Sequence, residues 1–332
     1  MQILWQPQEY VANLRENLGM RIDLKRCLVA AGVSGCFFAG VLWVAQFQGF
    51  DFSHLDPLLI TALFTIYVVL TVCRGLLLRA LAPIEKHLSV GTWFKLAARH
   101  QILFTLVPSG AGDIGFPHLL KKMAGLPIAT GVRIIAQVRM RDAAVLGSLG
   151  LLGLISQGFN PFLGSLGLAI TAVALWFIDD IAAFGLKTAA SLSPNGKVAA
   201  FLQTALSQKA PHRAHRLLCT LLSIVIWTVA ASGVGLAFYS AGHPLSVSEC
   251  MLVLALLNVI GAVAVSIGGL GVAEAGVAGA LIAMGTQPQE AAAVAIVVRP
   301  LMLFTLLCAS AVLDSAAGLF IRQNLKSDVS RP

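Results

Sequence analysis

Long uninterrupted apolar runs constrain the fold of this chain more than any other feature. They cover residues 27–48, 57–78, 161–178 and 217–241. A helix needs about 20 residues to cross about 30 Å of hydrocarbon, and each run reaches or approaches that length. Across the whole chain 58% of residues are hydrophobic and only 11% are charged, far from the composition of soluble domains. The chain is therefore expected to be an integral membrane protein.

The expected fold class is an all-α integral membrane protein, with about six spanning helices and two re-entrant helical hairpins arranged as an inverted repeat. No segment is long and polar enough to form a separate soluble domain, so residues 1–332 are expected to form a single transmembrane domain. The expected spans are 27–48, 57–78, 128–156, 161–186, 216–241 and 288–320.

Lysine and arginine are distributed unevenly between the connections. They gather in the N-terminal segment 1–26, the 79–99 connection, the 187–215 loop and the 321–332 tail, and are absent from 49–56, 157–160 and 242–247. The positive-inside rule places both termini and the 187–215 loop in the cytoplasm. The net charge of +8 thus reflects membrane topology, and no nucleic-acid partner is expected. The first 26 residues lack the apolar stretch of a cleaved signal peptide.

No motif assigns catalytic chemistry to the chain. The six cysteines stand singly, without CxxC spacing, which predicts buried apolar side chains and neither disulfides nor a metal site. HExxH, GxSxG and P-loop patterns are absent from the sequence. We therefore expect no cofactor and no enzymatic activity.

Two apolar stretches are interrupted by glycine in mid-membrane. The first runs over 93–107, breaks at 108–112 and resumes over 113–124, and the second runs over 250–265, breaks at 266–271 and resumes over 272–284. Lipid does not tolerate unpaired backbone groups unless that backbone is buried in protein or lines a cavity. Each stretch is therefore expected to be a re-entrant hairpin, which with the span that follows it occupies 93–156 or 247–320.

The two hairpin regions match each other at a fixed distance. Gly125 and Gly285 stand 160 residues apart, as do Arg139 and Arg299, and Asp113 precedes its counterpart Glu274 by 161 residues. With the expected spans the hairpins enter from opposite sides, which is the inverted-repeat plan of many secondary transporters. A rise of about 1.5 Å per residue carries each carboxylate and each arginine to a similar depth near mid-membrane.

Intramembrane charges are functional candidates by default, since an isolated charge there costs about 2.5–3.5 kcal/mol on insertion scales. The expected substrate-binding residues line a polar cavity for a lipid headgroup, with half-helix N-termini facing a phosphate. They are Asp113, Arg139, Glu274, Arg299, Gly110, Gly112, Gly268, Gly269 and Gly271.

The alternative interpretation of these charges is structural. Both carboxylates stand in the first turn of a half-helix, where the helix dipole favours them, and the arginines then neutralise them. Arg139 also stands three residues from Asp142, so a pair within one helix competes with the Asp113 pairing. Arg74, near a helix end, is expected to extend to the membrane surface.

The second break carries a family resemblance. The segment Gly268-Gly269-Leu270-Gly271-Val272-Ala273-Glu274, with Gly285 and Arg299 downstream, resembles the GGxGxxE hallmark of the lysylphosphatidylglycerol synthase transmembrane (flippase-like) family. Pro108 through Gly112-Asp113 is similar to the family's Pro-x-x-x-Gly-Glu element. The resemblance implies a bacterial inner-membrane protein that acts on lipids or lipid-linked intermediates, with translocation as its activity.

The chain departs from the family pattern at three places. The family usually has glutamate at Asp113, an arginine at or near Phe116, and prolines where Ser266 and Ile267 precede the glycines. These departures leave the headgroup open. The synthases that name the family carry a soluble aminoacyl-transfer domain after the membrane part, and this chain is expected to act without one.

Three functions follow from these observations. A translocator of a membrane lipid with an anionic or phosphate-containing headgroup accounts for the hairpins and the charges near the midplane. An accessory membrane subunit of a glycosyltransferase or lipid synthase partner is the second, and an intramembrane transferase the third. Flipping by purified protein would distinguish them.

Overall fold

The computed structural model describes residues 56–83, 88–107, 111–192, 196–206, 213–263 and 271–329. In these ranges every regular element is a helix and none is a strand, as an all-α membrane protein requires. The expected first span, 27–48, lies outside the described residues, as do Gly110, Gly268 and Gly269. The helices are α3 (Pro57–Leu81), α4 (Val90–Leu106), α5 (Ala111–Ala124), α6 (Ile128–Ser156), α7 (Pro161–Trp176), α8 (Ile178–Leu192), α9 (Gly196–Leu206), α10 (Arg213–Ser240), α11 (Val247–Val263), α12 (Val272–Ala283) and α13 (Pro288–Val329).

Local capping chemistry sets several helix starts. Asp56 accepts a hydrogen bond from the Leu58 amide at 2.8 Å, and Pro57 fixes the backbone of the first turn of α3. Asn160 caps α7 in the same way, with Pro161 following it. Ser89 accepts from the Thr92 amide at the start of α4. These caps satisfy amide groups that no helical carbonyl reaches.

Three helices among the described residues are long and apolar enough to cross a membrane: α3, α10 and α13. They coincide with the expected spans 57–78, 216–241 and 288–320. The 29-residue α6 has ample length but carries Arg133, Arg139, Arg141 and Asp142. The chain is thus an all-helical protein with clear membrane spans, and the full set of six remains a prediction.

The span expected over 161–186 is divided into two helices. The chain bends by 76° between α7 and α8, a pair that together would make a fourth crossing. The α7 helix ends at Trp176, and the carbonyl of the next residue, Phe177, accepts from the Asp180 and Ile181 amides at the start of α8. Asp179 and Asp180 occupy the first turn of α8, where the helix dipole favours carboxylates.

The expected 79–99 connection is also shorter than predicted. Helix α3 continues to Leu81 and α4 begins at Val90, so Lys95 and Arg99 lie within α4. Arg99 donates to Asp314 of α13 at 2.7 Å, which fixes the first hairpin to the last helix. At the other end of the chain, α13 continues as helix beyond the expected limit of 320 to Val329.

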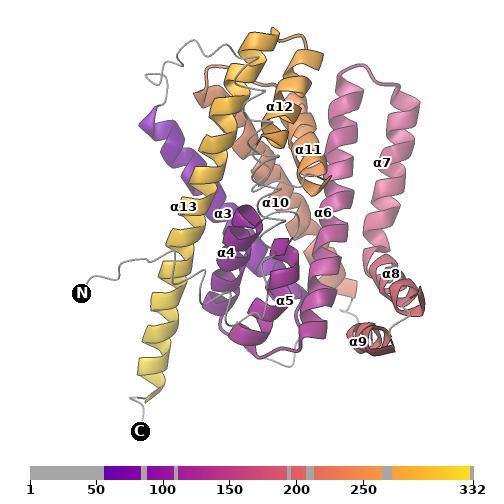
Figure 1. Cartoon of the computed structure of the whole chain (residues 1–332), viewed down its shortest axis with the longest axis vertical. Coiled ribbons are helices and arrows are strands. Elements are labelled where there is room, and N and C mark those ends of the chain that lie inside the picture. The colour runs from indigo at the N-terminus through magenta and orange to yellow at the C-terminus, as the bar shows by residue number, and fades with distance from the viewer. Residues whose placement is uncertain are drawn as a thin grey trace.

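The two helix pairs α4–α5 and α11–α12 have matching designs. Gly125 follows α5 and Gly285 follows α12, both with positive φ, 61° and 96°, which glycine adopts without steric cost. Each pair packs against the helix that follows it: α5 on α6, and α12 on α13. The first arms pack across the halves, α4 on α13 and α11 on α6. Figure 1 shows α4 and α5 in the lower half and α11 and α12 in the upper half. An inverted repeat would produce this arrangement, and the repeat itself remains a prediction.

The outer face of the bundle is apolar and the inner face is packed. Helix α7 exposes large apolar side chains along its length, including Leu166, Ile170 and Val173. The core instead joins α3, α4, α6, α10, α11 and α13 through residues such as Leu63 and Phe238. Because lipid and not water covers such an outer face, the polar groups that remain inside the bundle become the informative ones.

Candidate functional site

Asp113 and Arg139 form a direct ion pair between α5 and α6. Arg139 donates from Nε to Asp113 Oδ2 at 2.6 Å and from Nη2 to Asp113 Oδ1 at 2.7 Å. Two parallel hydrogen bonds of this kind make the strongest arginine–carboxylate geometry. The pairing predicted from helix depth is therefore present, and it joins the second arm of the hairpin to the middle of α6.

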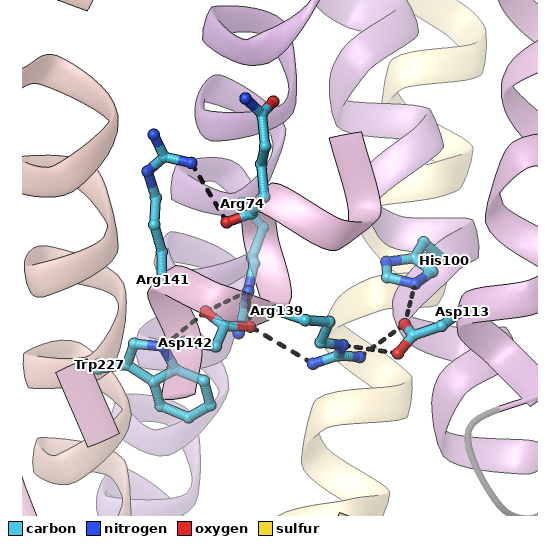
Figure 2. Close-up of polar contacts among 8 residues, drawn as sticks. Arg74, His100, Asp113, Arg139, Arg141, Asp142 and Trp227 are labelled. Carbon is cyan, nitrogen blue, oxygen red and sulfur yellow. Dashed lines mark hydrogen bonds and ion pairs between the residues drawn. The ribbon is translucent and has the colours of Figure 1, made fainter. Parts of the chain in front are cut away.

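The ion pair continues into the bundle through Asp142, as Figure 2 shows. Arg139 Nη1 lies 3.4 Å from Asp142 Oδ2, so the competing pair within α6 exists beside the Asp113 pair. Asp142 also accepts from Trp227 Nε1 of α10 at 2.7 Å. This carboxylate therefore holds groups from α6 and α10 together.

Arg74 is the third partner of Asp142. Its Nη1 lies 2.8 Å from Asp142 Oδ2 and 3.0 Å from Oδ1, and its guanidinium lies over the Trp227 ring, 5.0 Å from the centroid. The expectation that Arg74 extends to the membrane surface is wrong. The buried carboxylate offers charge neutralisation that a path along the helix to water does not.

His100 of α4 closes the other end of the cluster. Its Nε2 lies 3.2 Å from Asp113 Oδ1, and its ring meets the edge of Phe116 with centroids 5.0 Å apart. Phe104, one turn along α4, lies under the Arg139 guanidinium at 4.4 Å. We call this set the Asp142 network: Arg74, His100, Asp113, Arg139, Asp142 and Trp227.

The charges of the network balance, and its exposure changes along its length. Two arginines face two aspartates. The Asp142 side chain is 4% exposed, whereas those of Asp113 and Arg139 are 23% and 34% exposed. A ligand would therefore meet Arg139 and Asp113 first, with Asp142 behind them as a fixed counter-charge.

Gly112 explains how the hairpin arms come close enough to build this end of the network. A Cβ atom at Gly112 would lie 2.4 Å from Cα and 2.7 Å from the backbone nitrogen of Phe104. Only glycine fits such a backbone approach. The expected close packing at this glycine is present, and it sets the position of Phe104 beneath Arg139.

The corresponding residues of the second half are arranged differently. Glu274 is buried in the first turn of α12, and its Oε2 accepts from the amide of Gly271 at 2.5 Å. Gly271 itself has a φ of 83° and precedes the helix. Arg299 of α13 lies near enough to Glu274 for the two charges to attract each other. The backbone contact of Glu274 favours the structural interpretation for this carboxylate.

A second cluster lies on the next face of α6. Arg141 Nη2 donates to Asp179 Oδ1 at 2.7 Å, and Gln137 Nε2 donates to the same oxygen at 2.9 Å. Arg216 of α10 lies 3.5 Å from Asp179 Oδ2 and 3.0 Å from Asp180 Oδ2. These contacts fix the start of α8 to α6 and α10 just after the bend.

Apolar helices that enclose arginine–carboxylate clusters define a polytopic helical membrane protein. Residues 27–310 match the family described as Lysylphosphatidylglycerol synthase TM region, and the chain belongs to this family. No curated protein and no solved structure matches the chain.

Arg74, His100, Asp142 and Trp227 are the network members that sequence reasoning did not select as site residues, and Asp142 was considered only as a competing partner of Arg139. Arg74 and His100 offered a usable signal, since each is a polar side chain within an apolar helix. Trp227 offered none, because a tryptophan in an apolar span is ordinary and only its Nε1–H contact with Asp142 distinguishes it.

Proposed function

We propose that this protein translocates a lipid with an anionic or phosphate-containing headgroup, and that the headgroup binds at Arg139 and Asp113. The observation that carries the proposal is the Asp142 network. It is a charge-balanced chain of polar side chains that leads from the partly exposed Asp113–Arg139 pair to the buried Asp142. The residues form a transport site and are given no catalytic role.

A phosphate is suited to the exposed end of the network. Its oxygens match the two-pronged guanidinium of Arg139 as well as the Asp113 carboxylate does. The first turn of α5, which begins at Ala111, adds backbone amides and the positive end of a helix dipole. The phosphate therefore replaces Asp113 as the partner of Arg139, and the Asp113 carboxylate keeps His100, whose Nε2 lies 3.2 Å from Oδ1, as its remaining partner.

Asp142, which is itself paired with Arg74, helps to return Arg139 to its resting state after the headgroup has left. When the headgroup leaves, Arg139 has two carboxylates in reach, Asp113 at 2.6 Å and Asp142 at 3.4 Å. Its charge stays neutralised in the empty protein, which avoids the cost of an isolated charge in hydrocarbon. In the inverted repeat, Arg299 of the second half lines the opposite side of the path.

Purified protein in liposomes that contain a fluorescent phospholipid tests the proposal. A membrane-impermeant quencher bleaches only the fluorescent lipid of the outer leaflet, which is about half of the total. Transport brings inner-leaflet lipid to the outer leaflet, so more than half of the fluorescence is then lost. We expect this extra bleaching with the wild type and its loss with Asp142→Asn, which keeps the side-chain shape but removes the charge. The matched control is Asp180→Asn, since Asp180 also pairs with an arginine but lies at the exposed edge of the second cluster.

Two results would contradict transport through this network: no bleaching beyond half with folded wild type, or unchanged bleaching with Asp142→Asn. The first would favour the role of an accessory subunit for a glycosyltransferase or lipid synthase. A parallel assay for chemical turnover of the same lipid separates transport from catalysis.

A further inference from the structure

A cleft between α3 and α10 stands apart from the Asp142 network. It has a volume of about 400 Å³ and is apolar over most of its wall. Both helices are long and apolar enough to cross the membrane. The cleft is lined by Leu76, Arg79 and Ala80 of α3 and by His215, Leu218 and Leu222 of α10.

The two basic residues of the cleft lie at one end of it. Arg79 stands two residues before the end of α3 at Leu81, and His215 stands two residues after the start of α10 at Arg213. Because the two helices pack with these ends together, both side chains meet the same membrane surface. The apolar wall extends inward to Leu222, seven residues or about 10 Å beyond His215.

The charge of Arg79 has no carboxylate partner among the described residues, and neither does His215. Arg216, one residue beyond His215, differs because it pairs with Asp179 and Asp180. The basic rim of the cleft complements an anionic headgroup, and the apolar groove below it complements an acyl chain. A lipid with an anionic headgroup has both.

We propose that the α3–α10 cleft binds an anionic phospholipid, with an acyl chain between Leu76, Ala80 and Leu222 and the phosphate at Arg79 and His215. Water does not fill an apolar groove that opens into hydrocarbon, so a lipid chain occupies it. Juxtamembrane basic residues attract anionic headgroups from the adjoining leaflet. The site concerns binding alone and does not rest on the proposed translocation.

The site is tested by measuring lipid affinity. The full-length protein in neutral detergent is titrated with phosphatidylglycerol or with phosphatidylcholine of the same acyl chains, and native mass spectrometry measures the bound lipid. We expect the wild type to bind phosphatidylglycerol more tightly. The double variant Arg79→Gln/His215→Gln should lose on the order of tenfold or more of that affinity, since each basic side chain near the surface attracts the anion. The control, Lys121→Gln/Lys122→Gln, replaces two basic side chains in the exposed last turn of α5 and should bind as the wild type does.

A second variant tests the acyl chain. Ala80→Phe fills the cleft from its small-residue side and should weaken binding of both lipids. The proposal is overturned if the wild type binds the two lipids equally or if the Arg79→Gln/His215→Gln variant keeps full binding. An equal loss of affinity in the lysine control, or full binding by Ala80→Phe, overturns it as well. Arg79→Gln/His215→Gln lies outside the Asp142 network and should flip lipid as the wild type does even when it binds phosphatidylglycerol more weakly, so the two proposals fail separately.

Discussion

Arg141 and Asp179 form an ion pair in which the arginine side chain is 0% exposed and the aspartate side chain 2%, joined at 2.7 Å. The pair connects α6 to the first turn of α8. Removing one member leaves a buried charge without its partner, which typically costs 3–5 kcal/mol, whereas replacing both with apolar groups is often nearly neutral.

We therefore predict that Arg141→Met lowers the thermal stability of detergent-purified protein by about 3 kcal/mol or more. Arg141→Met combined with Asp179→Leu should recover part of the loss, although Gln137 and Arg216 then lose a partner. The measurement is a melting curve of each variant. Equal melting temperatures for the wild type and Arg141→Met would show that the pair is not a stabilising contact.

The Asp113–Arg139 pair gives a prediction that separates structure from transport. Asp113→Ala and Arg139→Ala should each abolish lipid flipping, because each removes the headgroup site and leaves a charge uncompensated. The exchange Asp113→Arg with Arg139→Asp should restore stability but not flipping, since a carboxylate would then face the phosphate from α6. Stability and bleaching are measured on the same preparations. Recovery of flipping by the exchange would assign the pair a structural role only.

Gly112 gives a steric prediction. Gly112→Ala should destabilise the protein by about 1–3 kcal/mol and lower flipping at least in proportion, because the new Cβ displaces the Phe104 backbone beneath Arg139. Gly279→Ala of α12 is the control, since nothing lies within 4 Å of its Cβ position. In the control the helix should gain up to about 1 kcal/mol. Full activity and stability in Gly112→Ala would contradict the close approach of α4 and α5.

Membrane orientation gives a fourth prediction. On a background without the native cysteines, Lys187→Cys in α8 should react only with reagents on the cytoplasmic side. Gln287→Cys, between α12 and α13, should react only from the outside. Labelling in intact cells and in inverted vesicles measures both. Reaction of the two positions from the same side would contradict the predicted topology and the inverted repeat with it.

The partners of the intramembrane charges were predictable from the sequence only in part. Counting helix rise placed Asp113 and Arg139 at one level, and the structure joins them. The same count placed Glu274 level with Arg299, but Glu274 bonds the Gly271 amide. Rise per residue fixes height along a helix but not the direction of a side chain, which depends on the packing of neighbouring helices.

Residues far apart in the chain were the hardest to connect. Asp142 contacts Arg74 of α3 and Trp227 of α10, 68 and 85 residues away. No local period encodes such contacts. The bend after α7 was missed for a related reason, since Trp176 and Phe177 continue the apolar run and only the two aspartates that follow mark a new helix start.

The bend at Phe177 has a consequence for the bilayer. Helix α7 has 16 residues and so rises about 24 Å, less than the 30 Å or so of a typical hydrocarbon layer, before α8 turns away at 76°. A short apolar stretch is accommodated by local thinning of the bilayer or by flanking side chains that extend to the surface, and α8 with its two aspartates follows α7 directly. The bend therefore ends the apolar face of α7 short of a full bilayer crossing and begins a polar face at Asp179 and Asp180.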